Sequence, residues 1–399
     1  MYRRLRPITT ISITWKLSTS PPPPPLPTLL SIQTTPKSTT TGGKNKKPKK
    51  KFYYRVPSLD HAMDLQKKPS LILLLKNLIT TSNKTHSIHL RDLEKEVGFI
   101  QKWNLMSIIE RYSTIFRVTG GSRFSPIAVT LTEKAARIAA EEAQVRELME
   151  PIVVKKLRKL LMMSLDCQVS LETIKSIESE MGLPGNFRES IIEKYPRFFS
   201  VVVIRGRDHL RLESWDSSLA VTAREKGSNL GGFEEGNWIA KDENYDCPSA
   251  FRLNFPPGFR ANVGYLEEVK KWQKLEFPSP YLNGRRVNHA TPQARKRMVA
   301  VLHELLSLTM ERRMSTAQLD ALRAEYRLPG KLLLCLVKHH GIFYLTNKGG
   351  RSTVFLKEAY QGSHLIDKCP LLRFNDKFLA LSGRVCDDFG NVMPSEPLC

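Results

Sequence analysis

The sequence predicts an α+β fold, mostly helical, in which a winged-helix-like unit of about 65 residues occurs three times. Each unit reads as three helices followed by a β-hairpin. Three observations predict this repetition. First, each helical pattern ends with an aromatic or His residue four positions before a Phe. Second, a β-branched run begins near that Phe. Third, a turn that contains Gly and Arg follows the run. The pairs are Tyr112 and Phe116, Tyr195 and Phe199, and His339 and Phe343, and the turns are 120–123, 205–207 and 348–351. Repeated units suit an extended ligand better than one small-molecule pocket.

Repeat 1 is predicted over residues 67–135. Apolar residues at helical spacing mark its first two helices, and a third helix occupies 103–112. The apolar positions of the first two helices are Leu71, Leu74, Leu75, Leu78, Leu90, Leu93 and Val97. Two β-branched runs, 115–118 and 127–131, then form the hairpin.

An Ala- and Glu-rich connecting helix is predicted over 136–150, in a helical pattern that Thr132 begins. Repeat 2 follows over 151–215. Ser170 is a suitable N-cap for its second helix. Pro184 stands where its third helix is expected to start, a position that tolerates the missing N–H.

An ordered insertion is predicted over 216–290, because this Pro/Gly-rich stretch is also aromatic. The anchoring residues in it and at its edge are Trp215, Trp238, Trp272 and Tyr281. Repeat 3 is predicted over 291–360, with a second helix from Ser315. The C-terminal segment, 361–399, is expected to fray after about Asn375.

The charge of the chain favours a polyanionic partner. The net charge is +23, and twelve Lys or Arg residues precede Asp60, the first acidic residue, which leaves +11 on the remaining 340 residues. The body is therefore basic even without its N-terminal segment, as expected of a protein that binds nucleic acid or an anionic membrane. Improved solubility is the alternative explanation for the excess of lysine.

The cysteines predict neither a metal site nor a disulfide scaffold. They form no CxxC pair and no Cys/His cluster with zinc spacing, so reduced thiols and no metal or cofactor are expected. The six are Cys167, Cys247, Cys335, Cys369, Cys386 and Cys399. The longest apolar run, 71–75, is far shorter than the roughly 18 residues that a membrane span requires, so no span is expected.

Residues 1–45 are typical of an organellar transit peptide, expected to be disordered. They are rich in Arg, Ser, Thr and Pro and contain no Asp or Glu, and Arg3, Arg4 and Arg6 lie near the start. Arginines there favour mitochondria slightly over chloroplasts, the alternative. A disordered basic arm that stays on the protein is the other interpretation. Residues 46–66 are read as a basic lead-in.

The chain resembles the plant organelle RNA recognition domain family over roughly residues 52–372. The segments that carry the resemblance are Lys67–Leu71, Arg158–Ser164, Gly182–Pro184 with Phe187, Tyr195–Phe199, Phe255–Phe259, and Trp272–Leu275 leading to Ser279–Tyr281. Cys369-Pro370-Leu371 stands where members commonly have a His-Pro-Leu-type segment. The resemblance implies a non-catalytic protein that binds organellar transcripts and promotes group II intron splicing, with other splicing factors as further partners. It supplies no residue-level map of the RNA contacts.

Clustered Lys and Arg residues are the candidate RNA contacts, because each phosphate neutralised releases counterions. We expect contact above all at the hairpin tips, where a cation stands beside Gly. The candidates are Lys155, Lys156, Arg158 and Lys159 in one helix, Arg123, Arg205, Arg207, Arg211, Lys348 and Arg351 at the hairpins, and Arg285 and Arg286 at the end of the insertion. A solvated helix face is the alternative for any single cluster. Phe52, Tyr53 and Tyr54, among basic residues, are candidate stacking platforms or simply pack on the domain surface.

Three rival functions remain open: duplex DNA binding by winged helices, protein scaffolding, and hydrolysis. Cys335 and His339 stand at i, i+4 in one predicted helix, the spacing of a nucleophile and its base. A core thiol is the favoured interpretation, because no oxyanion-type Gly loop adjoins the pair. The chain also lacks a P-loop and an HExxH motif.

Overall fold

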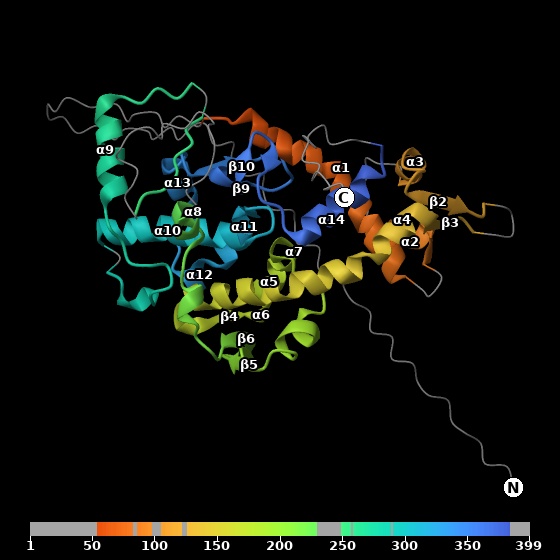
Figure 1. The fold of residues 1–399 in the computed structure, drawn as a ribbon, viewed down its shortest axis with the longest axis horizontal. Helices are drawn as coiled ribbons and strands as arrows, with labels where there is room; N and C mark the ends of the chain where they lie inside the picture. Colours follow the sequence, from red (N-terminus) through yellow and green to blue (C-terminus); the bar gives the residue numbers. More distant parts are fainter. Residues whose placement is uncertain are drawn as a thin grey trace, which may run out of the picture. The chain divides into compact units, whose positions relative to one another are not determined.

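The structure, a computed structural model, describes residues 54–82, 86–97, 105–121, 126–229, 249–256, 258–288 and 290–383. The chain divides into two compact units, 1–51 and 52–399, and every described residue belongs to the second. The predicted transit peptide therefore lies outside the described residues. The fold is mixed α and β, with helices predominating and with small antiparallel sheets (Figure 1). Within the described residues, no helix has the length and apolarity to cross a membrane.

The first region combines three helices with a three-stranded sheet. Its elements are α1 (Pro57–Thr81), β1 (Ser87–His89), α2 (Leu90–Val97), α3 (Leu105–Arg111), β2 (Phe116–Thr119) and β3 (Ala128–Leu131). The strands are antiparallel in the order β1-β3-β2. The hairpin strands lie within a residue of their predicted positions. Strand β1, between the first two helices, was not predicted, and α1 begins within the predicted lead-in.

A short helix and a long one follow: α4 (Glu133–Ala140) and α5 (Glu142–Met163). The Thr132 hydroxyl accepts a hydrogen bond from the Ala135 N–H, which confirms the predicted N-cap. Helix α5 passes through Pro151 without a break, so the predicted connecting helix and the first helix of the second region are continuous.

The second region repeats the order of the first. Its further elements are a 3₁₀ turn η1 (Leu165–Cys167), β4 (Gln168–Ser170), α6 (Leu171–Ser176), α7 (Glu178–Met181), a π-helical turn η2 (Arg188–Ile192), β5 (Phe199–Ile204) and β6 (Arg207–Leu212). The strand order is β4-β6-β5. Ser170 caps α6 as predicted, accepting from the Thr173 N–H at 3.1 Å. The third helix does not start at Pro184 but is reduced to η2.

The third region follows the same order, with its second helix divided into two short helices, as in the second region. Its elements are α10 (Pro292–Leu308), β7 (Arg313–Ser315), α11 (Thr316–Ala321), α12 (Arg323–Tyr326), α13 (Leu332–Lys338), β8 (Phe343–Thr346) and β9 (Thr353–Leu356), in the strand order β7-β9-β8. Ser315 and Gln318 form a reciprocal capping box, so α11 begins where predicted. All three sheets thus share one topology.

The insertion and the C-terminal segment add short elements. They are η3 (Ser217–Leu219), α8 (Ala223–Asn229), α9 (Val263–Lys274), η4 (Gly284–Arg286), η5 (Lys357–Ala359), β10 (Tyr360–Gln361), β11 (His364–Leu365) and α14 (Pro370–Ala380). Trp238 of the insertion lies outside the described residues. The C-terminal segment does not fray from Asn375, because Phe374 and Phe378 of α14 are buried.

Two large apolar cores position these elements. One joins the second and third regions and the insertion, and includes Leu157 of α5, Leu302 of α10 and Phe251. The other lies in the first region and takes in Leu75 of α1 and Phe378 of α14. The N-terminal turns of α1 instead pack on the third sheet, where the Asp60 carboxylate accepts from the Tyr344 hydroxyl at 2.8 Å. Helix α1 therefore connects the first region to the third.

Candidate nucleic-acid interface

The tip of the second hairpin presents two exposed arginines. Arg205 (φ +50°) and Gly206 (φ +73°) both adopt left-handed backbone, which closes a two-residue turn between β5 and β6. Arg205 and Arg207 are exposed, and neither forms an ion pair with a described residue. Arg211 is also exposed, but its guanidinium lies 2.8 Å from the Glu213 carboxylate. The tip is thus cationic, while the charge of Arg211 is already neutralised.

The tip of the third hairpin carries Lys348 and Arg351, both exposed. Gly349 lies against α1, since a Cβ there would come within 2.8 Å of Met63 Cε. This hairpin is therefore braced on α1 while its cations face solvent. The corresponding cation of the first hairpin, Arg123, lies outside the described residues.

The four predicted RNA contacts on α5 differ in solvent exposure. Lys155 is exposed, whereas Lys156 is half-buried. Burial, reinforced by the positive charge of Arg312, lowers the pKa of Lys156 to about 8. Lys155 is therefore the best placed of the four to meet a phosphate.

Arg158 and Lys159, which were also expected to contact RNA, have partners within the domain. The Arg158 guanidinium lies 4.2 Å from the centre of the Phe198 ring and donates to Asp216 Oδ2 at 3.2 Å. Lys159 is 6% exposed. The sequence shows a run of basic residues but not that two of them turn inward.

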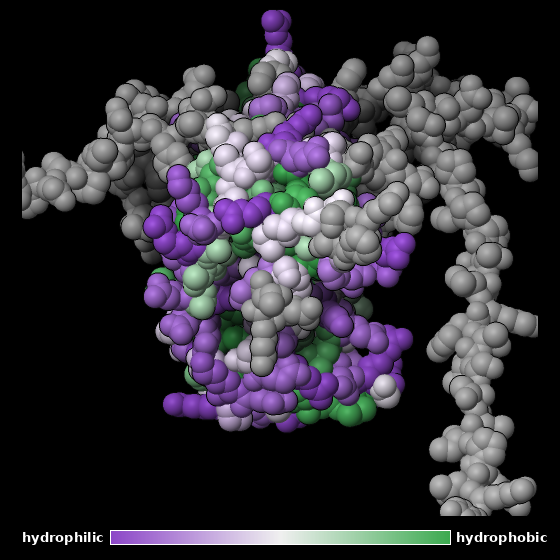
Figure 2. Space-filling view, turned by 90° about the vertical axis from the view of Figure 1, so that its right-hand side faces the viewer, coloured by the Kyte–Doolittle hydropathy of each residue, from purple (hydrophilic) through white to green (hydrophobic). Residues whose placement is uncertain are grey.

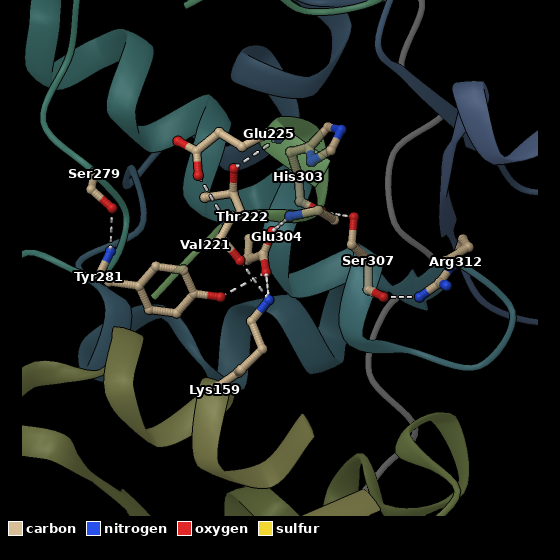
Figure 3. A network of polar contacts seen from close by, with 11 residues as sticks. Lys159, Val221, Thr222, Glu225, Ser279, Tyr281, His303, Glu304, Ser307 and Arg312 are labelled. Carbon is tan, nitrogen blue, oxygen red and sulfur yellow. Dashed lines mark hydrogen bonds and ion pairs between the residues drawn. The ribbon is translucent and has the colours of Figure 1, made fainter. Parts of the chain in front are cut away.

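Lys159 ends in a buried polar network around Glu304 of α10. Its Nζ lies 2.6 Å from Glu304 Oε1 and donates to the Val221 carbonyl at 2.9 Å. Glu304 also accepts from the Tyr281 hydroxyl at 2.7 Å and from the Ala223 N–H at 2.7 Å. Figure 3 shows Lys159 and Tyr281 both pointing at this carboxylate. The network joins α5, α10 and both ends of the insertion.

Two further cations of α10 are also internal. Lys296 donates to the carbonyls of Gln273 and Leu275 at 2.7 and 2.8 Å. Arg297 donates to the carbonyls of Ser279 and Pro280 at 3.1 and 3.0 Å. Part of the chain's basic composition thus holds the insertion in place.

The end of the insertion has one paired and one unpaired arginine. Arg285 lies 2.6 Å from Asp166 Oδ2. Arg286 is exposed and has no ion-pair partner in the described part of the chain.

Lys226 of α8, which was not among the predicted contacts, is exposed near Lys155. Burial and then the charges of Lys155 and Lys159 lower the pKa of Lys226.

The aromatic candidates are partly accounted for by packing. Tyr54 stacks on His340 at 5.6 Å and meets Phe259 edge-on at 5.2 Å. Tyr54 therefore packs on the domain surface, while Phe52 and Tyr53 lie outside the described residues.

The described surface of one face is largely hydrophilic, with small apolar patches (Figure 2).

The pair Cys335 and His339 has the wrong protonation states for a nucleophile and its base. Burial raises the pKa of the Cys335 thiol to about 11, and burial with the Lys338 charge lowers the pKa of His339 to about 4. Both pKa shifts are opposite to those of an activated thiolate and its general base, and the His339 ring lies 4.9 Å from the Trp272 ring. Among the described residues, no group of His, Cys, Asp and Glu is arranged to hold a metal.

The chain belongs to the plant organelle RNA recognition domain family, whose model matches residues 54–386. The match takes in all three regions and the insertion between them.

Three curated relatives are between 23% and 33% identical to this chain over the aligned residues. Protein WHAT'S THIS FACTOR 1 homolog, chloroplastic, of Oryza sativa subsp. japonica is 33% identical over 81% of the chain and 63% of the relative. Protein ROOT PRIMORDIUM DEFECTIVE 1 of Arabidopsis thaliana is 31% identical over 80% of the chain and 79% of the relative. Protein WHAT'S THIS FACTOR 9, mitochondrial, of the same plant is 23% identical over 81% of the chain and 82% of the relative. The chain spans less than two thirds of the length of the rice protein. No solved structure matches the chain.

Proposed function

We propose that this protein binds intron-containing transcripts in a plant organelle and promotes group II intron splicing without catalysing it. The observation that carries the proposal is at the second hairpin tip, where Arg205 and Arg207 are exposed and form no ion pair with a described residue. The chain that bears them belongs to an RNA recognition family. A cation beside Gly lets both backbone and side chain approach phosphate.

We propose further that the three regions are winged-helix units. The support is the shared order of three helices and strands and the shared strand order, β1-β3-β2 in the first region. In such units the hairpin is the wing, which contacts nucleic-acid backbone. Three wings on one chain would hold an extended stretch of RNA.

Among the predicted candidates, with Lys226 added, the proposed contact residues are the exposed cations that form no ion pair with a described carboxylate, and Arg123 is included from the sequence alone. They are Lys155, Arg205, Arg207, Lys226, Arg286, Lys348 and Arg351. Arg211, Arg285 and Lys156 contribute less in this proposal, since two are ion-paired and the third is half-buried with a lowered pKa.

The proposed location is a mitochondrion or a chloroplast. Arg3, Arg4 and Arg6 favour the mitochondrion, and the printed names of the first relatives favour the chloroplast. A fusion of residues 1–45 to a fluorescent protein tests this: signal in one organelle assigns it, and a fusion that stays in the cytosol contradicts import.

The splicing role is tested by immunoprecipitating the protein from organelle extract and sequencing the bound RNA. We expect reads enriched in group II introns over their flanking exons. Equal recovery of introns and exons, with unchanged splicing in plants lacking the protein, would reject the splicing role and leave general RNA binding.

One observation favours a scaffold role for the third region alone. Helix α13 exposes Leu333 (45%) and Leu334 (42%), which suit a protein partner better than a phosphate backbone. The pair Leu333→Gln and Leu334→Gln should then weaken co-purification of other splicing factors without changing the affinity for RNA.

A further inference from the structure

A cavity of about 460 Å³ opens where the first, second and third regions meet. Helix α1 contributes Met63, α7 contributes Glu180, the third hairpin contributes Gly349 to Arg351, and α14 contributes Leu372. Its volume falls within the range of about 300–1,000 Å³ found for small-molecule sites. The proposed splicing role makes no use of this cavity.

Part of the cavity lining is apolar and rich in thioethers. Met63, Met310 and Met314 line the cavity together with Leu372, and the Arg313 guanidinium donates to Met63 Sδ at 2.9 Å. Methionine sulfur makes favourable contacts with aromatic rings, and its flexible side chain adapts to flat ligands. The wall therefore suits a planar aromatic group.

The polar side offers a carboxylate with spare accepting capacity. Glu180 Oε2 accepts from the Ser179 hydroxyl at 2.8 Å, and no described residue donates to the other oxygen. The Glu311 carboxylate, in contrast, is engaged by Gln66 at 3.1 Å and by Arg313. A ligand with adjacent N–H donors would complete the hydrogen bonding of Glu180.

The rim is part of the third hairpin. Gly350 is exposed with open space around its Cβ position, and the exposed Arg351 has no ion-pair partner among the described residues. Since Arg351 also lines the cavity, an RNA strand held by Arg351 at a phosphate would lie next to it. The cavity is thus placed to receive a base from RNA that follows the hairpin.

We propose that this cavity binds a single guanine base turned out of the RNA strand, with its ring against the methionines and its Watson–Crick edge on Glu180. Guanine is the base that offers one carboxylate two adjacent donors, N1–H and the N2 amino group. Single-stranded RNA is commonly read through such unstacked bases. This inference rests on the proposed RNA binding and adds a sequence preference to it.

The experiment measures binding of the full chain to two fluorescent 20-nucleotide RNAs at one salt concentration. One is uridine throughout, and the other carries a single central guanosine. We expect the guanosine RNA to bind about tenfold more tightly, because only guanine donates two adjacent N–H groups to the Glu180 carboxylate. An RNA with a central adenosine should bind like the uridine RNA.

The variant Gly350→Trp should abolish the guanosine preference by filling the opening, and the readout is the ratio of the affinities for the two RNAs, because Gly350 lies in a hairpin tip proposed to contact RNA. Gly330→Trp is the matched control, because Gly330 is also exposed with open space around its Cβ position but lies outside the cavity. Glu180→Gln is a second variant that leaves the opening unfilled, and it should reduce the preference as well.

The binding measurements distinguish failure of the guanine site from failure of the proposed RNA binding. If neither RNA binds, the proposed function fails. If both bind equally well to the unaltered chain, or if Gly350→Trp and Glu180→Gln keep the preference, the guanine site is wrong and RNA binding stands.

Discussion

Lys159 of α5 and Glu304 of α10 form an ion pair in the core between the second and third regions, with side chains 7% and 0% exposed. The pair is completed by the Val221 carbonyl and the Ala223 N–H near the start of the insertion and by the Tyr281 hydroxyl near its end. An ion pair so deeply buried persists because its remaining hydrogen-bonding capacity is satisfied. It fixes how the second and third regions are held together.

Glu304→Gln should therefore lower the free energy of unfolding by about 3–5 kcal/mol, because the Lys159 charge is left buried without its counterion. Urea denaturation followed by circular dichroism measures the change. Lys155→Met is the control: it removes a cation one turn away on the exposed face of α5 and should alter stability by less than about 0.5 kcal/mol. Equal effects of the two variants would show that Lys159 and Glu304 are not coupled.

The second hairpin tip should contribute directly to RNA affinity. Arg205→Asn together with Arg207→Gln removes two unpaired cations, and Asn tolerates the left-handed backbone at position 205. We expect weaker binding and a salt dependence that is shallower by about 1 in the slope of log K against log salt concentration. Filter binding at several salt concentrations gives this slope.

Arg211→Gln is the matched control in the same hairpin. Its charge is already paired with Glu213, so its loss should change the slope much less. If Arg211→Gln reduces binding as much as the double variant, the distinction between paired and unpaired cations is wrong.

The buried imidazole of His339 should make stability depend on pH. Its pKa is lowered to about 4 from an ordinary value of 6.5, so the unfolded chain binds more protons between these values. The free energy of unfolding must then fall as the pH falls from 6.5 to 4, by up to about 3 kcal/mol. His339→Gln should flatten this dependence in denaturation curves across that window. His61→Gln, at an exposed position of α1, should leave it unchanged.

The Cys335 thiol should resist alkylation. With its pKa raised to about 11, it holds far less thiolate at pH 8 than a free cysteine, and we expect about hundredfold slower reaction with iodoacetamide. A variant that keeps Cys335 as its sole cysteine, followed by mass spectrometry with and without urea, measures this. Equal rates in folded and unfolded protein would revive the hydrolase interpretation.

The elements that the sequence predicts well are those with a strong local signal. Thr132 and Ser170 cap their helices where predicted, and the hairpins follow Phe116, Phe199 and Phe343. The short strands β1, β4 and β7 were missed because three residues are too few to show alternation, and their pairing depends on distant strands.

The exposure of the candidate cations was harder to predict, for a physical reason. The local sequence around a lysine in a basic run is the same whether its side chain faces water or a carboxylate that is distant in the sequence. Lys159 finds Glu304 and the Val221 carbonyl only when α5 and α10 pack together, whereas Lys155 on the same helix stays exposed. The solvent exposure of Arg205 and Arg207 was predictable, because a hairpin tip is exposed however the helices pack.

The central claim is that this protein binds single-stranded RNA through its exposed cations. The most direct measurement compares the affinity of the purified chain for a single-stranded RNA and for duplex DNA of equal length, across a series of salt concentrations. We predict tighter binding to RNA at every salt concentration, with a slope that decreases in the Arg205→Asn and Arg207→Gln variant. Preference for duplex DNA, or no salt-dependent binding to either nucleic acid, would contradict it.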